Sequence, residues 1–119
     1  MKRDSVLSLV GIAKKADKIA SGEFLTEAAV KSDRASLVMI SPEASGNTRK
    51  KFQNMCSFYQ IPAYLYGSRD ELGAASGTDF RVVLAVTDEG LAKAIEKKLV
   101  QAGVPRADAG VSGEGDKGI

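Results

Sequence analysis

Few side chains in this sequence have the type and spacing that catalysis needs, because the chain contains no histidine and a single cysteine. Histidine is the commonest general base and the commonest metal ligand, so no base–nucleophile pair can be named. Neither a GxxxxGK(S/T) phosphate loop nor a GxGxxG fingerprint after a strand occurs. We therefore expect no enzymatic activity, no catalytic residue, no metal site and no cofactor.

Cys56 is predicted to be an inert thiol. It lies with Phe52, Met55 and Tyr59 on the apolar stripe of a predicted helix, at spacing i, i+3, i+4, i+7. These four side chains are expected in the core, and a buried thiol is not a nucleophile.

The chemistry that remains is anion binding, centred on residues 18–32, KIASGEFLTEAAVKS. This segment predicts a short extended entry, a Ser-Gly turn and an amphipathic helix. Ser21 is expected to cap the helix, Glu23 suits the positive end of the helix dipole, and Gly22 allows another backbone to approach. Unpaired N–H groups at such a helix start attract anions.

Phe24 has two interpretations. On a helical wheel the apolar residues of this helix form one arc, made of Phe24, Leu25, Ala28 and Ala29, opposite Glu23, Thr26, Glu27 and Lys31. The default interpretation makes Phe24 a core residue that closes the first turn. The alternative leaves it half exposed, as a platform for a base or a partner.

Basic residues elsewhere also have two interpretations. Residues 49–51, RKK, fall on the first turns of a predicted helix, where the dipole disfavours cations. A bound polyanion would offset that cost, although solvated side chains also tolerate it. Phe80 and Arg81 add an aromatic and a cation to a predicted loop.

The elements that position these residues alternate between helices and short apolar strands. Helix starts are predicted at Asp4 or Ser5, at Ser45 or Asn47, at Ser68 within a capping box, and at Thr87 or Asp88. Strands are predicted over residues 36–41, 63–66 and 82–86, besides the entry to the segment above. This order predicts an α/β sandwich with helices on both faces of a sheet of about four strands.

The totals describe one soluble domain. The chain has 119 residues, 44% hydrophobic residues and a formal net charge of +2, and it has no apolar run of the ~20 residues that span a bilayer. We expect a cytoplasmic monomer that does not bind membranes. Residues 1–103 are assigned to the domain, and residues 104–119, rich in glycine, to a flexible C-terminal tail.

Four stretches occur in an order that resembles a known family. They are IAKKADKIASGE, ASLVMISPEAS, NMCSFYQIPAYLYGSRDELGAASG and RVVLAVTDEGLAKAI. Over about residues 7–99 the chain resembles the kink-turn RNA-binding ribosomal proteins of the L7Ae/L30e type, and within them the bacterial YlxQ-like branch. The resemblance implies a three-layer α/β/α sandwich around a four-stranded mixed sheet, whose last strand runs against the others.

The resemblance also implies a binding edge formed by residues 21–27, 41–44 and 78–82. In relatives this edge grips a sharply bent RNA, with the helix start against sheared G·A pairs and the last loop over a flipped-out nucleotide. We therefore expect a non-catalytic ribonucleoprotein component that contacts structured RNA, ribosomal RNA above all. The residues assigned to this contact are Lys18, Ser21, Gly22, Glu23, Phe24, Lys31, Ser41, Phe80 and Arg81.

The chain departs from the family at its signature. The Gly-x-Asn-Glu motif falls on residues 22–25, where only Gly22 is retained. Phe24 and Leu25 replace the Asn and Glu that read base edges, and a Lys that meets the RNA backbone falls on Ala28. Glu23 can still accept from a base amino group, so we expect RNA binding that is weaker or differently specified than in the archaeal ribosomal relatives.

Two other hypotheses remain open. The first is a protein-interaction module that docks on ribosomal or RNA-processing proteins through the same edge and has no kink-turn affinity of its own. The second is a stand-alone enzyme, since the fold is also used beside RNA methyltransferase domains to hold substrate. This chain has no cofactor domain, so activity assays should be blank.

Overall fold

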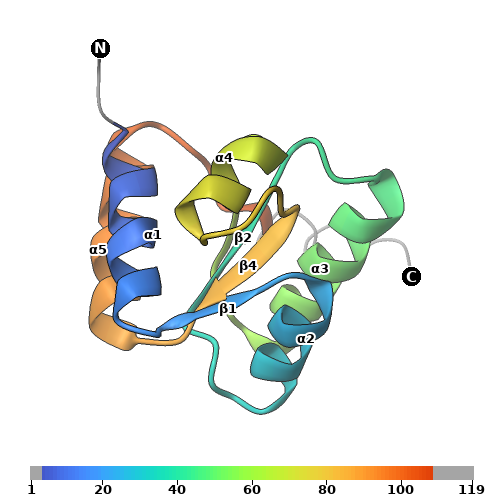
Figure 1. Cartoon of the computed structure of the whole chain (residues 1–119). Coiled ribbons are helices and arrows are strands. Elements are labelled where there is room, and N and C mark those ends of the chain that lie inside the picture. The colour runs from blue at the N-terminus through green and yellow to red at the C-terminus, as the bar shows by residue number, and fades with distance from the viewer. Residues whose placement is uncertain (1–3, 109–119) are drawn as a thin grey trace.

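Five helices alternate with four short strands over residues 4–108, the part of the chain that this computed structural model describes (Figure 1). No helix among these residues is both long enough and apolar enough to cross a bilayer. In chain order the elements are α1 (Ser5–Lys15), β1 (Ile19–Ser21), α2 (Glu23–Lys31), β2 (Leu37–Ile40), α3 (Gly46–Tyr59), β3 (Ala63–Leu65), α4 (Arg69–Ala75), β4 (Val83–Val86) and α5 (Glu89–Gln101).

The strands form one mixed sheet in the order β1-β4-β2-β3. β4 pairs antiparallel with both β1 and β2, while β2 and β3 are parallel. β4 therefore runs against the other three strands. This confirms the sheet expected from the family resemblance, which the apolar pattern alone had not specified.

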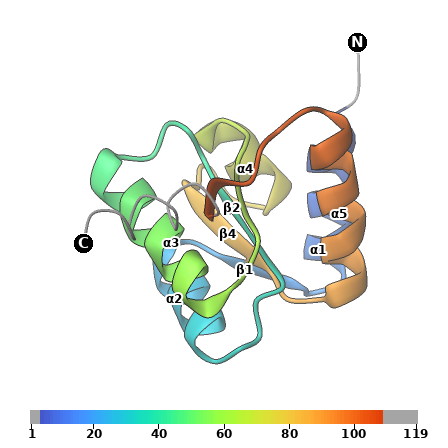
Figure 2. The ribbon, with the colours of Figure 1, turned by 180° about the vertical axis from the view of Figure 1, so that it is seen from behind.

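Each of the two central strands sends alternate residues to two separate apolar cores. Leu37, Met39, Leu84 and Val86 pack against α1, α4 and α5 on one face. Val38, Ile40, Val83 and Ala85 pack against α2 and α3 on the other. Because both faces are covered, the strands read as continuous apolar runs. Figures 1 and 2 show the resulting helix–sheet–helix layers, which confirm the predicted three-layer α/β/α sandwich.

Most helix starts follow the predicted capping chemistry. The side chains of Asp4, Ser45 and Asp88 accept from backbone N–H groups in the first turns of α1, α3 and α5. Ser68 and Glu71 form the predicted capping box at α4. Such caps each stabilise a helix by about 1 kcal/mol.

The start of α2 differs from its prediction. Gly22, not Ser21, is the N-cap, and no side chain caps this helix. The buried side of α2 consists of Thr26, Ala29 and Val30, while Phe24 is 83% exposed. The default placement of Phe24 in the core is therefore wrong. Thr26 takes a buried place because its hydroxyl donates to the carbonyl of Ala20 at 3.2 Å.

The stripe on α3 is predicted correctly only in part. Phe52 and Cys56 are fully buried, as expected, and Met55 is half-buried. Tyr59 is 40% exposed, so its assignment to the core is wrong. It is the last residue of the helix, where the chain turns away at Gln60 toward β3.

The chain beyond α5 returns to the β3 edge of the sheet (Figure 2). Arg106 forms a β-bridge with Tyr64, and the carboxylate of Asp108 accepts from the Ala63 N–H at 2.9 Å. Asp108 is also held by a two-pronged hydrogen bond from Arg106, at 2.8 and 2.7 Å. Residues 106 and 108, which the prediction assigned to the tail, thus contact the sheet. The rest of the predicted tail, residues 109–119, lies outside the described residues.

Candidate functional site

The three segments that the family resemblance assigns to binding meet at one end of the strands. β4 runs opposite to its neighbours, so its first residues lie beside the last residues of β1 and β2. The Gly22 N–H donates to the Val83 carbonyl at 3.0 Å, and the Ser41 N–H donates to the Val82 carbonyl at 2.7 Å. We call this surface the loop edge: residues 21–27, 41–44, 69 and 78–82.

Gly22 sets the geometry of the helix start at this edge. Its φ of 94° lies in the region that favours glycine. Since no side chain caps α2, the leading N–H groups of the helix remain available to a ligand at the positive end of the dipole. An anion is the ligand that such a helix start prefers.

Arg81 lies directly over this helix start. Its Nε donates to the Ser21 hydroxyl at 2.7 Å, and its Nη1 donates to the Phe80 carbonyl at 3.1 Å. Its Nε lies 3.4 Å from the position that a Cβ on Gly22 would occupy. Two hydrogen bonds thus fix a guanidinium beside the α2 amides, and Ser21 acts as its support rather than as a helix cap.

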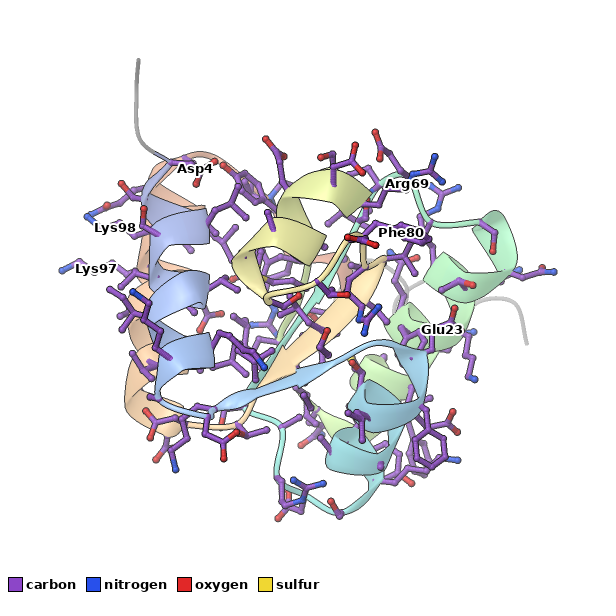
Figure 3. All side chains as sticks on the ribbon, viewed as in Figure 1. Asp4, Glu23, Arg69, Phe80, Lys97 and Lys98 are labelled. Atoms are coloured by element: carbon purple, nitrogen blue, oxygen red, sulfur yellow. The ribbon has the colours of Figure 1, made fainter. Side chains whose placement is uncertain are left out.

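Phe80 and Arg69 form a second feature of the loop edge. The Phe80 ring is 55% exposed, and the Arg69 guanidinium lies 5.8 Å from its centroid. Figure 3 shows the two side chains next to each other, with Glu23 on the α2 side of the same edge. A half-exposed aromatic ring backed by a cation is a suitable stacking surface for a base.

Arg69 also ties the loops together through its backbone. Its N–H donates to the Glu43 carboxylate at 3.0 Å, and its carbonyl accepts from the Arg81 N–H at 3.0 Å. Sequence reasoning missed Arg69, because its only local signal is its place in the first turn of a capped helix. Nothing in the sequence pattern places residue 69 next to residue 80.

Gly73 lets the loop that carries Phe80 reach its position. A Cβ at Gly73 would lie 2.3 Å from the Cα of Phe80 and 2.6 Å from the Asp79 carbonyl oxygen. The sequence-based interpretation gave Gly73 no role. Its role is to let α4 and the 78–81 loop pack backbone against backbone.

The loop edge encloses a shallow hollow of about 180 Å³, lined by Gly22, Glu23, Phe80, Arg81 and Val82. Exposed apolar side chains continue from it along α2, where Phe24 is followed by Leu25, itself 50% exposed. The surface thus combines helix amides, a fixed guanidinium and exposed rings. These groups can bind phosphate and stack on bases.

Two of the predicted contact residues lie away from the loop edge. Lys18 precedes β1, and its carbonyl accepts from the Thr87 N–H at the other end of the strands. Lys31 ends α2 and pairs with Glu27 at 2.8 Å. Hydrogen bonds from Lys31 and Lys51 lower the pKa of Glu27, and the two lysines share its single negative charge. Lys18 and Lys31 therefore lie outside the loop edge, and their contact with RNA stays a prediction.

Ser41 belongs to the loop edge but is fully buried. Its hydroxyl accepts from the Glu43 N–H at 3.0 Å and so shapes the turn after β2. Its contribution is to the position of the loop. The labelled lysines of α5, Lys97 and Lys98, extend from the opposite flank of the molecule (Figure 3).

The described residues offer no obvious catalytic chemistry. Within residues 4–108, no three or more His, Cys, Asp or Glu side chains are grouped so that they could hold a metal ion. Cys56 is buried, as predicted, and burial raises the pKa of its thiol to about 12. A neutral, inaccessible thiol is a poor nucleophile.

Comparison with known proteins agrees with this geometry. The chain is 43% identical over 84 residues to the RNA-binding protein YlxQ of Bacillus subtilis (strain 168), a match that covers 71% of this chain and 84% of the relative. It is 34% identical over 91 residues to the RNA-binding protein YlxQ of Enterococcus faecium, covering 76% and 87%.

Solved structures share the fold. A protein of unknown function from Bacillus halodurans superposes with a TM-score of 0.79 and 35% identity, over 82% of this chain and 98% of that one. The 15.5kD RNA binding protein of Giardia lamblia superposes with a TM-score of 0.69 and 18% identity, over 85% and 90%. Its low identity makes it evidence for the fold alone.

A family model matches residues 4–100, nearly the whole of the part that forms the sandwich. The proteins it groups are non-catalytic, in agreement with the expectation from the missing base and nucleophile. With the fold, the sheet order and two YlxQ relatives all in agreement, this chain belongs to the ribosomal protein L7Ae/L30e/S12e/Gadd45 family, in its YlxQ-like bacterial branch.

Proposed function

We propose that this protein is a non-catalytic RNA-binding protein that holds structured RNA at the loop edge. The observation that carries the proposal is the guanidinium of Arg81, fixed over Gly22 at the uncapped start of α2. Two YlxQ relatives, both named RNA-binding proteins, support it. Membership of the L7Ae/L30e/S12e/Gadd45 family also supports the proposal of RNA binding.

Phosphate binding follows from the helix start and Arg81 together. No side chain among residues 4–108 caps α2, so a phosphate oxygen would satisfy its leading N–H groups. The Arg81 guanidinium supplies a full positive charge at the same place. Such contacts position the RNA and carry no sequence information by themselves.

Base recognition then depends on the aromatic side chains. Phe24 occupies a position where relatives carry a residue that reads a base edge, and it points into solvent. Stacking on Phe24 and Phe80 is tolerant of base identity, because every base has a π-face. Glu23 remains as an acceptor for a base amino group.

The RNA we propose is a sharply bent one of the kink-turn type, with ribosomal RNA as the natural source. A bend lets one ligand present phosphates to the α2 start and unstacked bases to Phe24 and Phe80 at once. Because Asp70, Glu71 and Asp79 carry negative charge around α4, the RNA backbone should leave the edge toward Arg49 and Lys50 at the start of α3.

The test compares two labelled RNAs by fluorescence anisotropy: a kink-turn duplex, and a duplex of the same composition without the bend. Affinity is measured from 50 to 200 mM salt. We expect the bent duplex to bind more tightly, with an affinity that falls steeply as salt rises. Equal affinities would remove the kink-turn assignment, and no binding to either would remove RNA as the ligand.

The exposed pair Phe24 and Leu25 favours a second candidate function, in which the same edge docks a ribosomal or RNA-processing protein. In that case the purified chain binds neither RNA. Phe24→Ala would then weaken a complex with a protein recovered from cells. Light scattering on the free chain checks the further proposal that it acts as a monomer.

A further inference from the structure

A second hollow lies at the end of the strands opposite to the loop edge. It has a volume of about 340 Å³ and is built by three segments: residues 33–36 before β2, residues 59–62 between α3 and β3, and the first two turns of α5. We call it the far hollow. No residue of the loop edge contributes to it.

The floor of the far hollow is apolar and its rim is acidic. Ala35, Ile61 and Ala92 are buried and form the floor. The rim carries three carboxylates, Asp33, Glu89 and Glu96, against the single ammonium of Lys93. This local charge is opposite in sign to the +2 of the whole chain.

Two of the three rim carboxylates have no ion-pair partner in the described part of the chain. Glu96 accepts from the Tyr64 hydroxyl at 2.7 Å and lies 3.9 Å from Arg106. Asp33 and Glu89 are exposed, and neither forms an ion pair with any residue from 4 to 108. They are the carboxylates left to face a ligand.

An exposed aromatic pair continues the rim. Tyr59 lines the far hollow, and its neighbour Phe58 is 78% exposed. Their ring centroids are 5.0 Å apart in an edge-to-face arrangement. Aromatic side chains beside a pocket are the usual anchors of protein–protein contacts.

We propose that the far hollow docks a segment of a partner protein that carries Lys or Arg next to an apolar residue. The apolar residue fills the floor, the cation faces Asp33 and Glu89, and the Phe58–Tyr59 pair covers the cation by cation–π contact. RNA is disfavoured here, because phosphates would meet carboxylates. Since the loop edge and the far hollow lie at opposite ends of the strands, the protein can hold an RNA and this partner at the same time.

The test places a photo-crosslinking phenylalanine analogue, benzoylphenylalanine, at position 58 of the full-length chain in living cells. The same analogue at position 24 reports on the loop edge. Crosslinked products are digested and the attached segment is identified by mass spectrometry. We expect position 58 to capture a protein segment that contains Lys or Arg within a few residues of an apolar side chain.

A matched pair of double variants tests the charge. Asp33→Asn with Glu89→Gln neutralises the far hollow, whereas Asp17→Asn with Asp70→Asn removes the same charge elsewhere. Each pair contains one carboxylate at positive φ and one in the first turn of a helix, so their effects on stability should match. We expect the first pair to lower the position-58 crosslink about tenfold and the second to leave it unchanged.

Each alternative result overturns the proposal. RNA attached at position 58 would make the far hollow part of the RNA surface. Capture of an acidic segment, an equal effect of the two double variants, or no crosslink at all would remove the basic partner. The RNA function is judged separately, from the anisotropy of the two duplexes, so either proposal can fail while the other stands.

Discussion

Gly73 and Phe80 meet so closely that a Cβ on Gly73 would lie 2.3 Å from the Cα of Phe80. The neighbour that a Cβ would meet is backbone, which cannot rotate away. The loop that presents Phe80 and Arg81 therefore rests on a glycine that is not itself part of the loop edge. The position of this loop is set by its backbone contact with α4.

Gly73→Ala should displace this loop. Alanine favours the interior of α4 by about 1 kcal/mol, but forcing a methyl group into a packed contact costs typically 1 to 3 kcal/mol. We expect a net loss of stability in urea unfolding and a loss of RNA affinity. Gly11→Ala is the control, because nothing lies within 4 Å of a Cβ there. It should stabilise α1 and leave affinity unchanged; a similar result for Gly73→Ala would contradict the packing argument.

Phe24→Ala should separate binding from folding. Since the side chain is exposed, the free energy of unfolding should change by less than about 0.5 kcal/mol. Loss of a stacked base should weaken RNA binding by about 1 to 3 kcal/mol. Phe58→Ala is the matched control, an equally exposed ring on a different surface. If both variants bind RNA like the parent chain, Phe24 is not a base platform.

Ser21→Ala should weaken RNA binding without removing any charge. It takes away the acceptor that holds the Arg81 Nε at 2.7 Å, so the guanidinium loses its fixed place over Gly22. Arg81→Ala should weaken binding further and reduce the slope of log affinity against log salt by about 1. Lys97→Ala, on the opposite flank, should change neither quantity. An unaltered salt slope in Arg81→Ala would show that Arg81 meets no phosphate.

Asp108→Asn should destabilise the fold in a pH-dependent way. Burial tends to raise the pKa of Asp108, but hydrogen bonds from Arg106 and the Ala63 N–H outweigh it and hold the pKa below its ordinary value. The native carboxylate is thus stabilised relative to the unfolded one, so its contribution is present at neutral pH and lost as the pH falls below about 4. We expect the variant to be less stable by about 1 to 3 kcal/mol at pH 7.

Urea unfolding at pH 7 and pH 3 checks this expectation. The difference in stability between the parent chain and Asp108→Asn should narrow at the lower pH. Asp70→Asn, which removes an exposed carboxylate, should show little difference at either pH. A gap for Asp108→Asn that stays constant would mean that the carboxylate charge does not hold residues 104–108 on the sheet.

Cys56 should report on opening of the core between the sheet and α3. Burial raises the pKa of its thiol to about 12, so at pH 8 the folded protein presents almost no thiolate and no access. We expect iodoacetamide to modify Cys56 only at the rate at which the fold opens. Fast labelling of the native chain, measured by mass, would contradict the buried position.

Local chemistry was enough to predict much of this fold. Ser68 with Glu71, and Asp88 ahead of α5, are capping signals that act within one turn, and both appear as expected. The apolar runs of β2 and β4 required only burial on both faces. Strand direction depends on contacts between distant segments, so it came from the family resemblance and not from the pattern.

Two residues assigned to RNA contact lie away from the loop edge for a geometric reason. Lys18 and Ser21 are close in sequence, but β1 between them advances about 3.3 Å per residue, so they lie at opposite ends of that strand. Lys31 is carried away in the same manner by the length of α2. Residues close in sequence thus lie farther apart in the fold than their numbers suggest. The contact of Arg69 with Phe80 could not be predicted from the sequence, because it joins separate loops.

Phe24 was misplaced because a helical wheel weighs hydrophobicity and ignores the space available. The buried side of α2 consists of Thr26, Ala29 and Val30, all small enough to lie close to β1 and β4. The Phe24–Leu25 end of the apolar arc points into solvent instead and belongs to the loop edge, while Ala29 at its other end is buried.

The reversed direction of β4 has a consequence for how this protein can diversify. Turns that leave β1 and β2 and a turn that enters β4 converge on one rim, yet each is anchored to a different strand. Replacing an exposed side chain that forms no hydrogen bond to another turn, such as that of Phe24, leaves the frames of the other turns intact. Ligand preference can therefore drift during evolution, or be redesigned, one turn at a time on an unchanged sandwich.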